Sequence, residues 1–178
     1  MTTEYLLDRE VEMVLRALTP SNRRVMQVCL HTGLRVSDVL ELRTEQIQKS
    51  RFWVTEKKTG KKRMVGLPRD LREELVANAG EFWVFENRCD PNKHRSRQAV
   101  WKDVKRAAAA FRLPQNVAPH SFRKVYAVDL LENCGDIEKV QKALNHGSLE
   151  TTIIYAAAAQ LLAARKSTKA QRVGKRSR

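Results

Sequence analysis

The sequence predicts a mainly helical domain with one small antiparallel β-sheet, a fold of the α+β class. Apolar residues recur at helical spacing over most of the chain, one segment alternates as a hairpin does, and glycines and prolines separate these segments. At 178 residues the chain is long enough for one well-buried domain. Because neither a repeat nor a long linker divides it, we expect residues 1–164 to form one domain and residues 165–178 to form a basic, flexible tail.

Three helices are expected first. Asp8 is a suitable N-cap for a helix that ends at a proline-containing turn, and a second helix is expected over Asn22–His31. Thr32-Gly33 then breaks the chain before a short helix over Val36–Leu42. Arg35 is therefore expected at a helix-turn-helix junction.

The pattern changes over Arg51–Pro68, where two short apolar runs flank a lysine-rich centre. This predicts a β-hairpin with a strongly basic tip. A helix is expected over Asp70–Ala79, and Phe82–Phe85 is read as a short strand or a packed loop. The polar, basic segment Glu86–Arg97 is expected to be an exposed loop.

A long helix is predicted over Ser96–Phe111, with a stripe of residues expected in the core: Trp101, Val104, Ala108 and Phe111. A loop between two prolines then leads to a helix that begins near His120 and ends at Asn133-Cys134-Gly135. Asp136 is expected to cap a short helix that reaches Leu144. Beyond it, Gly147 and Ser148 can end one helix and start another, which is expected to continue to Ala164.

The net charge indicates a polyanionic partner. Lys and Arg number 34 against 20 Asp and Glu, which gives a net charge of +14 and a pI of about 10.1. A merely soluble surface needs a smaller excess of one sign, so nucleic acid is the leading candidate partner.

Compartment is indicated by what the sequence lacks. Its three cysteines, Cys29, Cys89 and Cys134, have neither metal-knuckle nor redox spacing, which favours a reducing compartment. No apolar run approaches a membrane span and the N-terminus does not resemble a signal peptide. We therefore expect a cytoplasmic protein that is associated with the nucleoid when it binds nucleic acid, with no membrane partner.

Two segments carry side chains suited to chemistry. His120-Ser121-Phe122-Arg123 places an imidazole and a guanidinium on one face of a helix start. His146 lies on a turn, and Tyr155 follows about two helical turns later. A tyrosine hydroxyl attacks a substrate only where a base and fixed positive charge stabilise its oxyanion. Arg35 and a hairpin lysine, Lys58, are expected to supply further positive charge.

Together these motifs resemble the catalytic domain of the tyrosine recombinases, the phage integrase family of DNA recombinases. The resemblance covers about Asp8 to Leu161. Its motifs are Thr32-Gly33-Leu34-Arg35-Val36-Ser37-Asp38-Val39-Leu40-Glu41-Leu42, Lys58 within Lys57-Lys58-Thr59-Gly60, His120-Ser121-Phe122-Arg123, and Leu144-Asn145-His146 followed by Tyr155. The expected fold is thus that of a DNA breaking-rejoining enzyme.

The resemblance implies a role for each residue. Tyr155 would attack a scissile DNA phosphate and form a 3′-phosphotyrosine, while Arg35 and Arg123 hold the phosphate oxygens. Lys58 would protonate the leaving 5′-oxygen. Proton transfer at the tyrosine would involve His120, and His146 would hydrogen-bond the phosphate.

Supporting features follow from the same resemblance. Asp38 would orient its neighbours, and strand exchange would need neither metal nor other cofactor nor small-molecule substrate. A protein that is a monomer in isolation would assemble as a tetramer on paired double-stranded DNA sites. The N-terminal DNA-clamping domain of most members is missing from this chain, which predicts either a catalytic fragment of a longer integrase or a short stand-alone recombinase.

Other interpretations stay open. A type IB topoisomerase-like enzyme would share the chemistry, and a non-catalytic DNA-binding module would share the fold. Three further lysines near Lys58 compete for its role, namely Lys57, Lys61 and Lys62. Tyr126 is the competing tyrosine, but it is expected in the core. Phosphate contacts or simple solvation would equally suit the loop cations Arg88, Lys93, Arg95 and Arg97.

Overall fold

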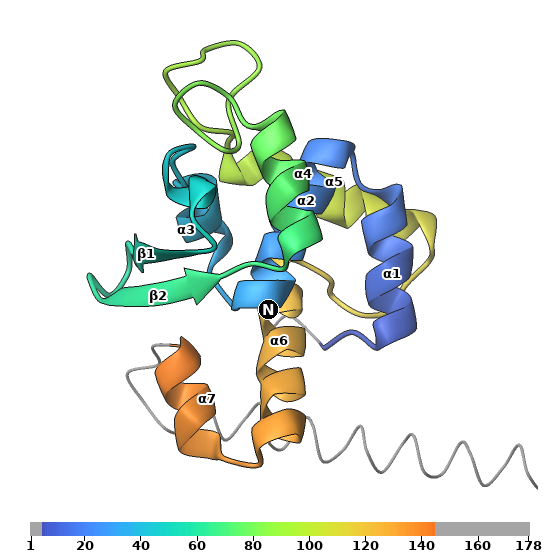
Figure 1. Cartoon of the computed structure of the whole chain (residues 1–178). Coiled ribbons are helices and arrows are strands. Elements are labelled where there is room, and N and C mark those ends of the chain that lie inside the picture. Colours follow the sequence, from blue (N-terminus) through green and yellow to red (C-terminus); the bar gives the residue numbers. More distant parts are fainter. Residues whose placement is uncertain (1–4, 145–178) are drawn as a thin grey trace, which may run out of the picture. The chain divides into compact units, whose positions relative to one another are not determined.

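The computed structural model describes residues 5–144, and the chain forms two compact units that divide between Tyr126 and Ala127. The described part is mainly helical with a two-stranded antiparallel sheet, as the sequence predicts (Figure 1). Its elements in chain order are α1 (Asp8–Ala17), α2 (Pro20–Thr32), α3 (Val36–Leu40), the 3-10 helix η1 (Gln46–Gln48), β1 (Arg51–Thr55), β2 (Lys62–Gly66), α4 (Arg69–Asn78), α5 (Arg97–Ala110), α6 (Pro119–Cys134) and α7 (Ile137–Leu144).

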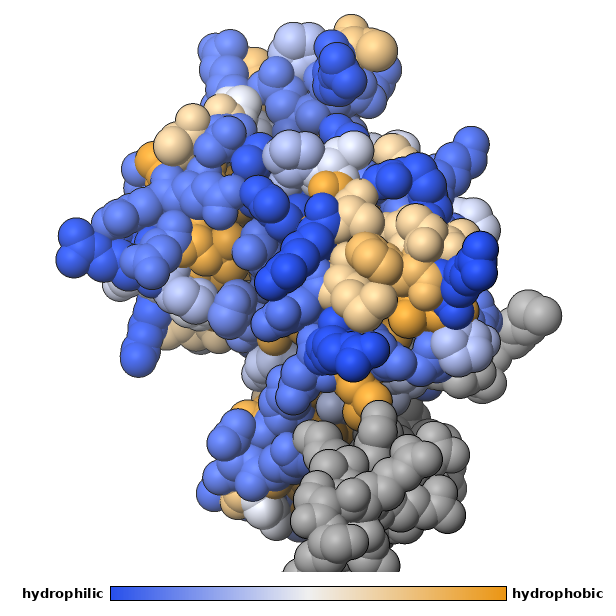
Figure 2. Space-filling view, turned by 90° about the vertical axis from the view of Figure 1, so that its right-hand side faces the viewer, coloured by the Kyte–Doolittle hydropathy of each residue, from blue (hydrophilic) through white to orange (hydrophobic). Residues whose placement is uncertain are grey.

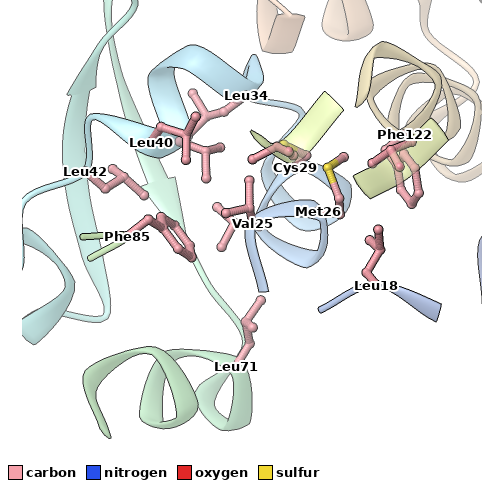
Figure 3. Packing of buried hydrophobic residues seen from close by; sticks show 14 of the residues in the cluster. Leu18, Val25, Met26, Cys29, Leu34, Leu40, Leu42, Leu71, Phe85 and Phe122 are labelled. Atoms are coloured by element: carbon pink, nitrogen blue, oxygen red, sulfur yellow. The ribbon is translucent and has the colours of Figure 1, made fainter. Parts of the chain in front are cut away.

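Helix α2 is the centre of the hydrophobic core of the first unit. Its residues Val25, Met26 and Cys29 are all at most 1% exposed. Figure 3 shows them between Leu34, which follows α2, and Phe122 of α6. Since a fully buried side chain of this size contributes about 1.5–3 kcal/mol, these contacts are enough to hold α3 and the start of α6 against α2.

The start of α1 differs slightly from the sequence prediction. Asp8 is the first helical residue and not the cap, and Leu7 occupies the N-cap position. The Glu10 carboxylate accepts a hydrogen bond from the Leu7 backbone N–H at 2.8 Å, so the first turn is capped by a side chain three residues further on.

Helix α5 buries a face that is rotated from the predicted one. Val104 and Ala108 are buried as expected, but Trp101 is 47% exposed and Phe111 is 38% exposed. The helix buries Val100 in their place. Because successive residues differ by about 100° around a helix, a stripe through Val100 and Val104 turns Trp101 towards solvent.

The hairpin has the predicted position and a clear inner face. Val54 of β1 pairs with Arg63 of β2, and Phe52 pairs with Val65. Phe52, Val54 and Val65 are buried, whereas the cross-strand pair of Trp53 and Met64 is more than half exposed. The segment Phe82–Phe85 is a packed loop. An isolated antiparallel β-bridge pairs its Trp83 with Arg43, which follows α3.

The second unit contains the end of α6 and helix α7. Gly135, in the left-handed conformation at φ 63°, follows α6, as predicted for that segment. The Asp136 carboxylate then accepts the backbone N–H of Glu138 at 2.9 Å, which confirms the predicted cap. Val140 and Leu144 are buried.

Polar side chains dominate the face shown in Figure 2, where they surround an apolar patch. This fits a chain in which 30% of residues are charged. No helix among residues 5–144 is both long and apolar enough to cross a membrane.

Asp103 of α5 caps α2 from outside the helix. Its Oδ2 accepts hydrogen bonds from the Thr19 backbone N–H at 2.9 Å, the Thr19 hydroxyl at 2.8 Å and the Asn22 amide at 2.7 Å. Its Oδ1 accepts from Arg106 at 2.6 Å. Burial opposes ionisation, but these hydrogen bonds outweigh it and lower the pKa of Asp103 from 3.8 to about 2. One carboxylate therefore ties α5 to the start of α2.

We expect Asp103→Asn to lower the free energy of unfolding at pH 7 by about 2 kcal/mol, since hydrogen bonds to a charged group are lost. Because the folded pKa is depressed, the stabilisation is present above pH 3.8 and is lost as the pH falls towards 2. Urea unfolding at pH 7 and pH 3 measures both effects. Asp70→Asn, at an exposed position of α4, is the control, and an equal loss in the two variants would contradict the capping role.

Gly33 ends α2 in a conformation that suits glycine. Its φ is 63°, and its N–H donates to the Cys29 carbonyl at 2.8 Å. A Cβ at this position would lie 2.3 Å from Cδ1 of Tyr126. Gly60 at the hairpin tip has a similar φ of 66°, but no heavy atom lies within 4 Å of the corresponding Cβ position.

Gly33→Ala should therefore destabilise the fold more than Gly60→Ala does. Both variants strain the backbone by about 1–2 kcal/mol. Overpacking against the Tyr126 ring should add about 1–3 kcal/mol for Gly33→Ala alone. Urea unfolding of the two variants measures the difference, and equal losses would mean that the ring moves aside at little cost.

Candidate active site

The junction between α2 and α3 presents Arg35. Arg35 is the N-cap of α3 and follows the Gly33 turn by two residues, as predicted. Its side chain is 21% exposed. It lines two hollows of the surface, one of about 210 Å³ and one of about 880 Å³. The guanidinium is thus held by the fold and also faces solvent.

The start of α6 brings His120 and Arg123 to the same place. Both residues line the 210 Å³ hollow together with Arg35. Arg123 is only 2% exposed, and its Nη1 donates to the Gly33 carbonyl at 2.5 Å. A hydrogen bond thus joins α6 to the turn that precedes Arg35. Arg35 thus meets an imidazole and a second guanidinium that follow it in the chain by 85 and 88 residues. Two guanidinium groups and an imidazole at one hollow form an arrangement suited to an anion.

His120 is held in its neutral form. Its pKa is lowered from 6.5 to about 4, first by desolvation and then by the positive charges of Arg123, Lys124, Arg35 and Lys58. The residue is nevertheless exposed at the rim of the hollow. A neutral imidazole can accept a proton at neutral pH, which is what proton transfer at a nucleophile needs.

Lys58 lies on the hairpin tip and is exposed. With Lys57 and Arg35 it lines the 880 Å³ groove, and its positive charge is one of those that lower the pKa of His120. Lys57 forms an ion pair with Glu41 at 2.5 Å, whereas Lys61 and Lys62 do not line this groove. Of the four candidates, Lys58 therefore combines a position on the groove with a charge that is not paired among the described residues.

Asp38 lies behind these groups. It is 2% exposed, and its Oδ1 accepts the Lys57 backbone N–H at 3.0 Å. Burial raises the pKa of Asp38, and the Lys57 hydrogen bond opposes this rise. The contact joins α3 to the hairpin.

Sequence reasoning missed Glu56 and Arg63. Glu56 is completely buried, and its carboxylate contacts Arg35 and Arg63. Burial lowers the pKa of Arg63, and the charge of Glu56 opposes this effect. In the structure Arg63 pairs with the buried Val54 across the hairpin, so it lies on the inner face of β2.

Tyr126 packs against the Gly33 turn and does not line the hollow of Arg35, His120 and Arg123. It is half-buried beside Gly33 and lines neither hollow. The other predicted residues, His146 and Tyr155, and the helix expected to end near Ala164, lie outside the described residues.

The loop cations have different surroundings. Lys93 and Arg97 line the large groove, and Lys93 also pairs with Asp90 at 2.8 Å. Arg95 donates from Nε to the Asn22 amide oxygen at 2.6 Å, so it supports the fold. Arg88 is exposed. Within the part of the chain that the structure describes, no group of three His, Cys, Asp or Glu side chains is arranged to hold a metal ion.

Comparison with known proteins identifies the family. The sequence model of the Phage integrase family matches residues 4–161. The integrase of Escherichia phage P2 is 29% identical over 154 residues, which are 86% of this chain and 43% of the phage protein. The chain belongs to the phage integrase family.

Solved structures share the fold. The catalytic domain of bacteriophage HP1 integrase matches with a TM-score of 0.68 at 21% identity, over 93% of this chain and 95% of that one. A lambda integrase tetramer bound to a Holliday junction matches with a TM-score of 0.72 at 20% identity, over 87% of this chain and 48% of that one. The predicted fold is confirmed, and the chain spans about half the length of the P2 and lambda proteins.

The lowered pKa of His120 can be tested by NMR titration of the imidazole, with His120→Gln to assign its resonances. We expect a midpoint of about 4, and a higher midpoint with inorganic phosphate, because an anion in the hollow favours the charged ring. The unfolded ring takes up its proton near pH 6.5, so His120 should lower stability as the pH falls below that value. A midpoint near 6.5 that phosphate does not move would contradict this description of the hollow.

Proposed function

We propose that this chain is the catalytic part of a site-specific DNA recombinase that breaks and rejoins double-stranded DNA. Beyond membership of the family, one observation supports the proposal: Arg35, His120 and Arg123 line the same hollow. Fixed positive charge at this position suits the phosphate of a DNA backbone, and the net charge of +14 suits the polymer.

In the proposed reaction the Tyr155 oxygen attacks the scissile phosphorus. The P–O5′ bond breaks, and a 3′-phosphotyrosine and a free 5′-hydroxyl form. Rejoining reverses the step, as the 5′-hydroxyl of a second strand displaces the tyrosine. The phosphodiester bond energy is conserved in the covalent link, so the step balances without a nucleotide or another co-reactant.

The remaining residues would stabilise charge and move protons. Arg35 and Arg123 bind the non-bridging oxygens, where charge accumulates in the transition state. Lys58 protonates the leaving 5′-oxygen, and neutral His120 assists removal of the tyrosine proton. His146 donates a further hydrogen bond to the phosphate. Asp38 supports the hairpin through the Lys57 backbone.

The partners belong to the same proposal. The lambda integrase structure is a tetramer on a Holliday junction, and we propose a tetramer of this chain on paired DNA sites. Residues 1–164 would then be the catalytic domain and residues 165–178 a basic tail. A cytoplasmic location follows from that partner.

A nicked suicide duplex, which releases a short 5′-hydroxyl strand after cleavage, tests this function. Wild-type protein should form a covalent DNA adduct, and Tyr155→Phe should form none. Tyr126→Phe is the matched control, because its ring lies at Gly33 and away from the hollow, and it should retain the adduct. Peptide mapping of the adduct identifies the linked residue. Adduct formation by Tyr155→Phe would refute the assigned nucleophile.

Arg35→Ala should lower the rate of adduct formation by about 100-fold or more, since a preorganised charge at the phosphate is lost. Arg16→Ala, whose side chain is 79% exposed on α1, controls for total charge. A non-catalytic DNA-binding module would yield no adduct from wild type and similar DNA affinity in both variants. Relaxation of supercoiled DNA without strand exchange between two duplexes would indicate a topoisomerase.

A further inference from the structure

A buried carboxylate lies directly behind the candidate phosphate site. Glu56 follows β1 and its side chain is completely buried. Its Oε2 accepts a hydrogen bond from Nη1 of Arg35, and its Oε1 lies 3.4 Å from Nε of Arg63. The carboxylate therefore bridges a residue of the α2–α3 junction and a residue of β2.

Hydrogen bonds also hold the backbone of Glu56 in place. Its N–H donates to the Lys61 carbonyl at 3.0 Å, and its own carbonyl accepts from Gly60 at 2.8 Å. Lys58 lies inside the turn that these two bonds close. The position of the carboxylate is thus linked to the hairpin tip.

Arg63 extends the connection to α2. Its Nη2 donates to the Thr32 carbonyl at 2.5 Å. The chain of contacts runs from the end of α2 through Arg63 and Glu56 to Arg35. Arg35 is therefore attached to the fold at both its backbone and its guanidinium.

Stability alone is a poor explanation for this cluster. A buried ion pair loses about as much free energy by desolvation as it gains by attraction, and apolar residues of similar volume are often at least as stabilising. A guanidinium, however, has five N–H donors in a rigid plane, and fixing one of them orients the rest. Arg35 uses Nη1 for Glu56 and still lines both hollows.

We propose that Glu56 is a positioning residue that orients the Arg35 guanidinium towards the phosphate and couples it to the Lys58 hairpin. The proposal rests on the proposed function and deepens it. Asp38, which the sequence suggests for such a role, contacts the Lys57 backbone, whereas Glu56 contacts Arg35 itself. A substrate phosphate would meet an arginine whose orientation is already determined, so little ordering remains to be done in the transition state.

Glu56→Gln keeps the shape of the side chain and removes its charge. We expect single-turnover cleavage of the nicked duplex at saturating DNA to slow by about 10–100-fold, as is typical when a group that orients a functional residue is lost. The DNA concentration that gives half the maximal rate should stay the same or fall, because one negative charge near the DNA is removed. Loss of orientation thus appears in the rate and not in binding.

Glu73→Gln is the matched control. Glu73 pairs with the exposed Arg69 on α4 at 2.8 Å and lines neither hollow, so this variant also removes one negative charge but does not affect Arg35. We expect its cleavage rate to stay within about twofold of wild type, as for an exposed ion pair. Equal rates for the two variants, at equal folded fraction, would overturn the proposal.

NMR of the arginine side chains supplies a readout that needs no activity. The Arg35 Nε–H resonance, assigned with Arg35→Lys, should be sharp and slow to exchange in wild type and should broaden in Glu56→Gln. If wild type does not cleave DNA, the proposed function fails while this measurement still tests the positioning. An unchanged Arg35 resonance in folded Glu56→Gln would refute it.

Glu56→Asp covers the case in which Glu56→Gln does not fold. It keeps the charge and shortens the side chain by one methylene, so the contact with Arg35 should weaken. We expect slower cleavage and a broadened Arg35 resonance in the folded protein. Wild-type behaviour in both measurements would overturn the proposal.

Discussion

The C-terminal end of α2 is the point on which the site depends. Helix α2 ends with carbonyl groups that carry the negative end of its dipole, and two arginine side chains donate hydrogen bonds to them. Arg63 donates to the Thr32 carbonyl, and Arg123 donates to the Gly33 carbonyl, each at 2.5 Å. The first arginine comes from the hairpin and the second from α6. The end of one helix thus binds both the element that carries Lys58 and the element that carries His120, and Arg35 follows its C-cap, Gly33, by two residues.

Charge balance makes this concentration of arginines tolerable. Arg35, Arg63 and Arg123 lie close together, and repulsion among them would disfavour the fold if nothing opposed it. Glu56 and Asp38 lie behind them, both almost fully buried. The two carboxylates stabilise the arginines from the core side and leave the outer side to an anion. The hollow therefore keeps an excess of positive charge, which adds to the effect of desolvation in lowering the pKa of His120.

Glycine at position 33 couples backbone geometry to this site. Its left-handed conformation turns the chain sharply enough that its carbonyl faces Arg123, and the absence of a side chain lets the Tyr126 ring lie against the turn. At the other end of α2, Asp103 accepts a hydrogen bond from Asn22, and Arg95 donates one to the same residue. Arg95 belongs to the loop that also carries Lys93. Both ends of one helix are thereby attached to segments that line the groove.

Local pattern was sufficient to predict much of the protein. The alternation of apolar runs and turn residues determined the helices, the hairpin and the Gly33 turn, because these depend on contacts within a few residues. The spacing of His120 and Arg123 likewise needs only the geometry of one helix. The stripe containing Trp101 was wrong because several faces of α5 are apolar, and only its neighbours decide which one is buried. Glu56 and Arg63 looked like ordinary charges of a basic hairpin. Tertiary structure alone could assign them, because the free energy of a buried charge depends on partners that lie about 20 to 30 residues away in the sequence.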